Sequence, residues 1–202
     1  TVEFAKLHGA GNDYIAVDGR GIDRDWGALS VEMSRLAFGV GSDGIVLVQD
    51  SDVAQIRMRA YNPDGSEAEM SGNGIRLFSK FVIDRKIVVP TPDGLMVETG
   101  GGVRTVWPTM DGDKMVSAKV AMGEPTFVPS EIPVDVSLIG DLDIVKAYPI
   151  QAGGRELKIT CLAVGNPHAV VVMDEPVEDF PLVEIGPHVE NHKLFPNRIN
   201  FE

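Results

Sequence analysis

The sequence predicts an α+β protein with two domains of similar design, in which a sheet encloses a helix. Three observations predict this class. Segments with alternating apolar and polar residues dominate the chain, one helical segment is apolar on most sides, and a pattern from the first part of the chain recurs near its end. Alternation with a period of two residues is typical of half-buried strands, and a helix that is apolar nearly all round has to be enclosed.

The clearest strand spans residues 54–61. Its apolar residues should face a core and the intervening ones should face outward; the two sets are Ile56, Met58, Ala60 and Arg57, Arg59, Tyr61. The same alternation predicts strands through Val116, Ala118, Val120 and through Leu157, Ile159, Cys161. Cys161 is the one cysteine of the chain, so no internal disulfide can form, and we expect it in the core, where free cysteines usually lie.

Two segments of the first half predict helices. The first runs from Trp26 to Phe38, with Asp23 or Asp25 as N-cap and Gly39 as its end. Its apolar face consists of Trp26, Leu29, Met33, Leu36 and Ala37, so it should lie on a surface. The second runs from about Ser71 to Asp84 and is apolar on most sides, through Ile75, Leu77, Phe78, Phe81 and Val82. We expect sheet to enclose this helix, which places its N-terminus inside the protein.

Turn-forming residues mark the connections. Thr99–Gly102 predicts a hairpin, whereas Asp111–Asp113 and the proline-rich segment 125–133 predict the loosest connections in the middle of the chain. We place the domain boundary near residues 116–120. This gives an N-terminal domain of residues 1–118 and a partial C-terminal domain of residues 119–202.

The chain also repeats itself. Gly11–Asp18 and Gly165–Asp174 both begin with Gly-Asn, continue as an apolar strand and end in Asp, 154 positions apart (165 minus 11). A helical pattern follows each copy, at Trp26–Phe38 and at Leu182–Val189. Such self-similarity predicts two domains of like design. At this offset the counterpart of Ser71 would fall at about position 225, roughly twenty residues past the last one, so we expect the second domain to be incomplete.

The composition favours a globular protein. Of 202 residues 44% are hydrophobic, which is enough for a substantial core. A net charge of -12 argues against nucleic acid and anionic membranes as partners, because both select clustered Lys and Arg. No apolar run approaches the roughly 20 residues that cross a bilayer, and the first residues lack the features of a signal peptide. We therefore expect a cytoplasmic protein.

The densest group of chemically informative residues is Asn62–Arg76, where a strand runs into a turn and then into the buried helix. Gly72 and Gly74 leave the first amides of this helix uncovered, and such amides, with the helix dipole, suit a carboxylate. An acid–base group at position 71 would lie in the same field. Taken alone, the segment is explained more simply by a serine N-cap at Ser71 and by glycines that serve the turn.

Five segments extend this pattern over the whole chain: Leu7–Tyr14, Gly39–Gly44, Asn62–Arg76, Gly165–His168 and Phe195–Phe201. They resemble motifs of the diaminopimelate epimerase family, in the same order and spacing.

The resemblance implies two pseudo-symmetric domains, each a curved, mixed, mostly antiparallel sheet wrapped around a central helix, with the active site in the cleft between them. It implies a homodimer that uses no cofactor, neither pyridoxal phosphate nor metal. Its reaction interconverts LL- and meso-diaminopimelate in the biosynthesis of lysine and peptidoglycan precursors. Two cysteines act on opposite faces of the α-carbon, one as thiolate and one as thiol. Helix N-termini lower the pKa of such thiols and hold the substrate carboxylate.

Carried onto this sequence, the resemblance assigns roles to individual residues. Ser71 occupies the position of the first catalytic cysteine. The implied substrate contacts are Asn12, Asn62, Gly72, Asn73, Asn166 and Asn200. His168 matches a histidine near the catalytic pair that modulates a thiol pKa. The alternative for His168 is a buried histidine that bonds a backbone carbonyl after Pro167.

Two departures from the family affect the expected activity. A serine hydroxyl cannot replace a thiolate unless a neighbouring base activates it. The second cysteine of the family, in a Cys-Gly-Ser/Thr-Gly motif preceded by a substrate-binding Arg and Glu, would lie beyond Glu202. We therefore expect this chain to be inactive as an epimerase. A catalytically inactive ligand-binding fragment is the alternative from outside the enzyme class.

Other functions fit the motifs less well. Gly39–Gly44 fits G-x-G-x-x-G, but a dinucleotide site needs a strand before it and a helix after it, whereas here a helix precedes and the strand Ile45–Val48 follows. A serine hydrolase needs glycine where Glu69 and Asn73 stand. The Gly-Asn-Asp-Tyr and Gly-Asn-Pro-His motifs favour diaminopimelate epimerase over proline racemases and phenazine-biosynthesis isomerases. Histidine racemase stays open.

The histidines do not indicate a metal site. His8, His168, His188 and His192 show no paired ligand spacing with carboxylates. His188 and His192 are four residues apart but lie in a segment interrupted by Gly and Pro, so we expect both on the solvated surface.

Overall fold

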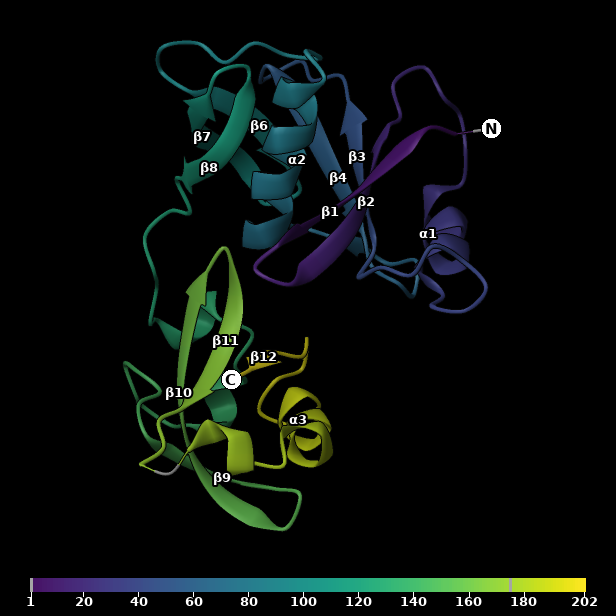
Figure 1. Cartoon of the computed structure of the whole chain (residues 1–202). Coiled ribbons are helices and arrows are strands. Elements are labelled where there is room, and N and C mark those ends of the chain that lie inside the picture. The colour runs from purple at the N-terminus through teal and green to yellow at the C-terminus, as the bar shows by residue number, and fades with distance from the viewer. Residues whose placement is uncertain (1, 175) are drawn as a thin grey trace. The chain divides into compact units, whose positions relative to one another are not determined.

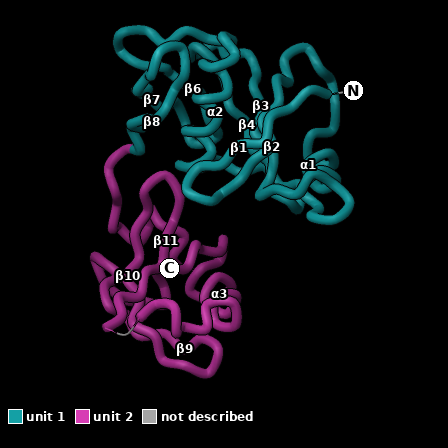
Figure 2. Tube along the Cα trace, in the orientation of Figure 1, with its two compact units in different colours: residues 1–122 teal, residues 123–202 magenta. Residues whose placement is uncertain are grey.

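The computed structural model describes residues 2–174 and 176–202. The chain forms two compact units, Thr1–Met122 and Gly123–Glu202 (Figure 2). The division lies after Met122 rather than at residue 118, because β8 (Lys114–Val120) is hydrogen-bonded along its whole length to the sheet of the first unit. Each unit has its own hydrophobic core.

A mixed sheet of eight strands, counted over the described residues, makes up most of the first unit (Figure 1). Neighbours are antiparallel except for two parallel pairs, β2 with β3 and β4 with β6. Along the sheet the strands are β1 (Phe4–Gly9), β2 (Asn12–Asp18), β3 (Ile45–Gln49), β4 (Ile56–Tyr61), β6 (Leu95–Thr99), β7 (Gly102–Asp111) and β8, and β5 (Glu67–Ala68) pairs with β4. The mixed, mostly antiparallel sheet is as expected.

The helix that this sheet encloses is α2 (Gly72–Asp84), seen in Figure 1 with strands around it. It contacts β1, β2, β3, β4, β7 and β8. Ile75, Phe78 and Val82 are completely buried. Burial of one such side chain stabilises a fold by about 1.5–3 kcal/mol, so these contacts hold the helix and its N-terminus in place. The predicted helix and its enclosure are confirmed.

The first helix, α1 (Trp26–Ser34), is shorter than predicted. Asp25 caps it, as one of the two candidates. The prediction that it continues to Phe38 with Leu36 on its apolar face is wrong, because the chain folds back after Ser34 and Leu36 is 91% exposed. The buried residues of α1 are Trp26, Leu29, Ser30 and Ser34. Ser30 tolerates burial because its hydroxyl donates to backbone carbonyls of residues 61 and 62.

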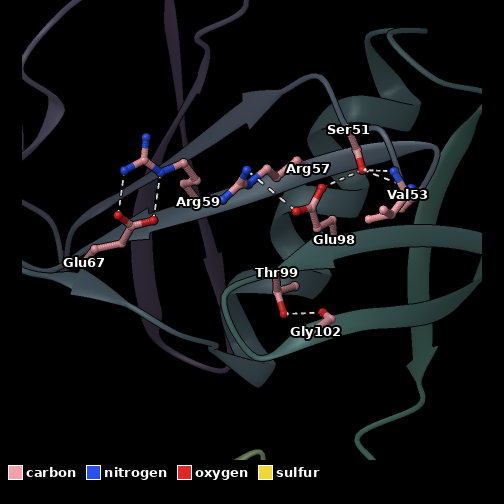
Figure 3. Close-up of polar contacts among 9 residues, drawn as sticks. Ser51, Val53, Arg57, Arg59, Glu67, Glu98, Thr99 and Gly102 are labelled. Carbon is pink, nitrogen blue, oxygen red and sulfur yellow. Dashed lines mark hydrogen bonds and ion pairs between the residues drawn. The ribbon is translucent and has the colours of Figure 1, made fainter.

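The outward side chains of β4 are held by ion pairs (Figure 3). Arg59 makes two hydrogen bonds with the Glu67 carboxylate, of 2.7 and 2.6 Å, and Arg57 lies 3.6 Å from Glu98. The Arg59 guanidinium lowers the pKa of Glu67 and ties β5 to β4. Tyr61 was expected on this outward face too, yet it is only 7% exposed, because it packs in a second core cluster beneath α1.

One predicted strand face is wrong because of a β-bulge between β7 and β8. The register shifts between Thr109 and Met110, which leaves Val116 as the extra residue of β8. Val116 is 62% exposed, and Met115 takes the core position instead. A bulge displaces every later side chain to the other face, so alternation alone could not place Val116.

The predicted connections are ordered turns. Thr99–Gly102 joins β6 to β7 as a hairpin, and the Thr99 hydroxyl donates to the Gly102 carbonyl at 2.7 Å (Figure 3). Gly112, with φ +59°, turns the chain between β7 and β8. The proline-rich segment contains a 3-10 turn, η1 (Pro129–Glu131).

The second unit has a four-stranded sheet. In order, its strands are β12 (Asn200–Phe201), β11 (Asn166–Val171), β10 (Arg155–Val164) and β9 (Tyr148–Ala152); its helical segments are α3 (Leu182–Glu190), η1, η2 (Val136–Leu138) and η3 (Val177–Asp179). Leu157, Ile159 and Cys161 face the core of this unit, as predicted. Burial raises the pKa of the Cys161 thiol to about 12.

The repeat in the sequence is also a repeat in structure. β2 pairs antiparallel with β1 and parallel with β3, and α1 joins β2 to β3. In the second unit β11, β10, β12 and α3 repeat this arrangement. Gly11 and Gly165 precede the repeated Asn and have φ of +88° and +80°, a region that favours glycine. Since α3 corresponds to α1, the described part of this unit holds no counterpart of α2. No helix in the described residues is long and apolar enough to span a membrane.

Candidate active site

Ser71 is the N-cap of the enclosed helix. Its backbone is extended (φ -136°, ψ 119°), and its Oγ accepts a hydrogen bond from the Gly74 N–H at 3.0 Å. The first N–H groups of a helix have no acceptor within the helix. Within the described residues the Ser71 side chain satisfies only the N–H of Gly74, so the amides of Gly72 and Asn73 are available to an anion. No acidic residue lies in this first turn.

The β6–β7 hairpin holds the segment that leads to Ser71. The Gly101 N–H donates to the Glu69 carbonyl at 3.0 Å. A Cβ on Gly100 would lie 2.9 Å from the Glu69 Cα, closer than such atoms approach, so the contact requires glycine. Met70 packs in the same core cluster as α2. Position 71 is therefore fixed by contacts on both sides of it along the chain.

Gly74→Ala should disturb the cap itself. A Cβ on Gly74 would lie 2.9 Å from the Ser71 Cβ, whereas a Cβ on Gly72 would meet Met122 at 3.5 Å, an ordinary contact. We expect Gly74→Ala to lower the free energy of unfolding by about 1–3 kcal/mol, because crowding outweighs the roughly 1 kcal/mol by which alanine favours a helix. Gly72→Ala, the matched control, should be neutral or slightly stabilising in the same urea titration. Equal effects of the two substitutions would contradict this role of Gly74.

Asn73 lies in the first turn of α2, and its side chain is engaged by Arg76. The Arg76 Nη2 donates to the Asn73 Oδ1. The turn between β1 and β2 packs on both residues, since a Cβ on Gly9 would lie 3.2 Å from the Asn73 carbonyl oxygen and 3.7 Å from the Arg76 Nη2. The N-terminus of α2 thus adjoins the turn that leads to Asn12.

Asn12, the first residue of β2, is held by Asp43. The Asn12 Nδ2 and the Asp13 backbone N–H both donate to the Asp43 Oδ2, at 2.7 and 2.8 Å. The Asp43 N–H donates in return to the Asp13 carbonyl at 2.7 Å. The Asp13 carboxylate faces elsewhere, toward the Lys6 ammonium at 2.7 Å, whose hydrogen bond lowers the pKa of Asp13.

Asn62 lies in the turn between β4 and β5. Its Nδ2 donates to the Ser66 Oγ at 3.0 Å, and the Ser66 hydroxyl donates to the Asp64 carboxylate at 2.6 Å. The Ser30 hydroxyl of α1 donates to the Asn62 backbone carbonyl at 2.8 Å. The side-chain bond of Asn62 is therefore made within its own turn.

In the second unit three of the expected residues form one cluster. The two ring nitrogens of His168 lie 2.7 Å from the Glu202 Oε1 and 2.8 Å from the Asn166 Oδ1. Asn200 pairs with His168 across β11 and β12, and its Nδ2 donates to the Pro167 carbonyl at 2.8 Å. The alternative in which His168 bonds a backbone carbonyl is wrong, because both of its nitrogens meet side chains.

Sequence reasoning missed three residues of these sites: Asp43, Arg76 and Glu202. Asp43 and Arg76 lie inside motifs that the sequence singled out, so the motifs were the available signal, but neither residue was assigned a partner. Asp43 binds a residue 31 positions earlier and Glu202 one 34 positions earlier. Only the strand pairing brings such residues together.

Two other expectations concern the surface. The glycine-rich segment Gly39–Gly44 joins α1 to β3, so its context is helix then strand, as expected, and opposite to a dinucleotide site. His188 is exposed, as predicted. His192 is not, because its ring packs near Phe195 and its Nδ1 accepts the Leu194 N–H at 3.2 Å; burial lowers its pKa.

The chain is similar in sequence to known proteins of one family. Residues 4–128 match the family described as diaminopimelate epimerase. The chain is 45% identical to the diaminopimelate epimerase of Agathobacter rectalis, over 100% of this chain and 71% of that protein. The chain belongs to the diaminopimelate epimerase family. The proteins of that name from Acetivibrio thermocellus and Methanothermobacter thermautotrophicus are 42% and 44% identical, over 100% and 98% of this chain and 70% and 68% of theirs.

Solved structures share the fold of this family member. A probable proline racemase from Agrobacterium radiobacter K84 matches with a TM-score of 0.66 at 14% identity, over 95% of this chain. A hydroxyproline epimerase from Agrobacterium vitis matches with a TM-score of 0.60 at 14% identity, over 93%. The chain spans 55% and 54% of the length of these solved chains. At this identity the likeness shows the α+β fold, while the family places the chain among isomerases that work without pyridoxal phosphate.

Proposed function

We propose that this chain binds diaminopimelate around the N-terminus of α2 but, with Ser71 in place of a thiol, does not epimerise it. One observation carries the proposal. Ser71, whose Oγ lies 3.0 Å from the Gly74 N–H, is at the N-terminus of a 13-residue enclosed helix, which supports its assignment as the acid–base position of the family. The same helix end offers the amides of Gly72 and Asn73 to a carboxylate.

The chemistry of the site suits an amino acid that is charged at both ends. The amides of Gly72 and Asn73 bind the α-carboxylate and stabilise the negative charge that develops when an α-proton leaves. The remaining contacts in the first unit are the neutral carboxamides of Asn12 and Asn62. A carboxamide can accept from an ammonium or donate to a carboxylate, so it serves both kinds of substrate group without adding charge.

The absence of turnover follows from the groups at hand. Within the described residues the one hydrogen bond of the Ser71 Oγ comes from Gly74, so no base is in contact to take the hydroxyl proton. Cys161, the one cysteine of the sequence, is fully buried with its pKa raised to about 12, so it does not supply a thiolate.

Isothermal titration calorimetry with meso-diaminopimelate tests the proposal. We expect saturable binding with a Kd in the range of about 1 μM to 1 mM, typical for substrates of biosynthetic enzymes. Asn62→Ala should weaken binding, because the donor and acceptor of this side chain are lost. L-Histidine is the control ligand for the related racemase. No binding of meso-diaminopimelate, or tighter binding of L-histidine, would contradict the proposal.

We further propose a cytoplasmic homodimer that serves the biosynthesis of lysine and peptidoglycan precursors. Membership of the family supports it, and the net charge of -12 agrees with a small amino-acid ligand rather than nucleic acid as the partner. Sedimentation velocity should show a dimer at micromolar concentration. A monomer that persists up to about 100 μM, where even weak dimers associate, would refute the dimer.

A further inference from the structure

The hydrogen bonds of Asn12 and Asn73 fix which end of each carboxamide is left for a ligand. A carboxamide has an acceptor, Oδ1, and a donor, Nδ2. The partner of Asn12 is the Asp43 carboxylate, which only accepts, so one of the two N–H groups of Nδ2 is used and both lone pairs of Oδ1 are left. The partner of Asn73 is the Arg76 guanidinium, which only donates, so one of the two lone pairs of Oδ1 is used and both N–H groups of Nδ2 are left. The two residues are therefore set in opposite senses.

We propose that Asp43 and Arg76 are positioning residues that set Asn12 as an acceptor for an ammonium group of the substrate and Asn73 as a donor to a carboxylate. This inference rests on the proposed function, since it takes diaminopimelate as the ligand. A substrate that carries an ammonium and a carboxylate on one carbon needs both kinds of group close together. Gly9 packs on Asn73 and lies opposite Asn12 in the β1–β2 pairing, so the two asparagines are both neighbours of Gly9.

Only one of the two orientations of the Asn12 carboxamide is chemically possible. The Asp43 Oδ2 also accepts the Asp13 N–H at 2.8 Å, which fixes this oxygen in place. A reversed Asn12 would bring its own oxygen to 2.7 Å from a carboxylate oxygen, with no hydrogen between two acceptors. Asp43 thus selects one orientation by chemistry and not only by shape.

Hydrogen-bond partners orient two further asparagines in the same way, Asn200 in the second unit and Asn62 in the first. The Asn200 Nδ2 donates to the Pro167 carbonyl, which only accepts, so its Oδ1 is left as well. In the turn after β4, the Ser66 hydroxyl proton goes to Asp64, so the Ser66 Oγ accepts from Asn62 and the Oδ1 of Asn62 is left. Partner chemistry thus turns the Oδ1 of Asn12, Asn62 and Asn200, and the Nδ2 of Asn73, away from their protein partners.

The test compares two ligands on the full chain. Pimelate has the two terminal carboxylates of a seven-carbon chain, as diaminopimelate does, but no ammonium group. Asp43→Leu keeps the shape of Asp43 and removes its acceptor. We expect it to weaken binding of meso-diaminopimelate about tenfold or more, the usual size of one hydrogen bond to a charged group, and to change binding of pimelate less than about twofold. Arg76→Met, the matched variant, should weaken binding of both ligands, because Asn73 is then no longer held with its Nδ2 set to donate to a carboxylate.

The conservative variant separates orientation from charge. In Asp43→Asn the amide oxygen can take the place of the Oδ2, so binding of meso-diaminopimelate should return to within about threefold of the unmodified chain. Asn12→Ala should show the ligand pattern of Asp43→Leu, and the double variant should be no weaker than either single one. These comparisons also cover the case in which Asp43→Leu does not fold.

Three results would overturn the inference: equal weakening of both ligands by Asp43→Leu or Asn12→Ala, no effect of either substitution, or no recovery in Asp43→Asn. These results differ from failure of the proposed function. If the unmodified chain does not bind meso-diaminopimelate, the function itself is wrong. If it binds and Asp43→Leu binds equally well, only the role of Asp43 is wrong.

Discussion

Gly44→Ala is expected to abolish stable folding of the first unit. Gly44 has φ +138°, and a Cβ there would lie 2.1 Å from the Tyr61 carbonyl oxygen. That oxygen cannot retreat, because Tyr61 is paired with Ile45 in the β3–β4 ladder. Backbone strain and backbone overlap therefore add up, and we expect a loss of at least about 4 kcal/mol in the free energy of unfolding, among the largest effects of single substitutions.

Gly112→Ala is the matched control for this loss. Gly112 also has a positive φ, +59°, but a Cβ there would have no atom within 4 Å. It should cost only the strain of the left-handed region, about 1–2 kcal/mol. Urea unfolding followed by circular dichroism compares the two. A Gly44→Ala protein as stable as Gly112→Ala would contradict the close approach at Tyr61. Since Gly44 follows Asp43, the same contact also anchors the residue that holds Asn12.

Ser71→Cys is expected to create a thiol that reacts at neutral pH. The N-cap position offers the Gly74 N–H and the positive end of the α2 dipole, and both stabilise a thiolate more than a thiol. The pKa of the introduced thiol should therefore fall from the ordinary value of about 8.5 to about 7.5 or lower. Because the pKa is lowered, the reactive thiolate is present above the lowered value and is lost only below it.

The pH dependence of alkylation by iodoacetamide measures this pKa. Cys161 does not interfere, because it is fully buried and its pKa is raised to about 12. Ser117→Cys, at an exposed position on β8 that is not a helix cap, is the control, and its thiol should titrate near the ordinary value of about 8.5. Equal midpoints for the thiols of Ser71→Cys and Ser117→Cys would show that the cap position does not activate a thiol.

The parts of the fold that depend on local pattern were predictable from the sequence. The inward faces of β4 and β10, the enclosed α2 and the β6–β7 hairpin all follow from periodicity and turn residues. The wrong predictions arose where contacts between distant parts of the chain override the local pattern. Leu36 fits the helical pattern of α1, but the helix ends at Ser34. Val116 fits the alternation of a strand, but it is the extra residue of a bulge in β8 opposite β7. Tyr61 lies on the expected face but is covered by α1.

The site was predictable in its residue types but not in its internal contacts. Ser71 as an N-cap follows from a serine before a buried helix, and the cluster around His168 brings together two segments that the family motifs had marked. The roles of Asp43 and Arg76 could not be read from the sequence, because a hydrogen-bond partner is a property of the folded chain. Their motifs mark the segments of the site, but the partner of Asp43 comes from the folding of the sheet and that of Arg76 from the first turns of α2.

The central claim is that this chain binds diaminopimelate but has no base that removes its α-proton. The most direct test measures incorporation of deuterium at the α-carbon of meso-diaminopimelate in D2O, on a sample in which binding is also determined. With Ser71 in place we expect the ligand to bind and to gain no deuterium above the rate in buffer alone. Incorporation of deuterium by the unmodified chain would contradict the inactivity assigned to Ser71, and absence of binding would contradict the site.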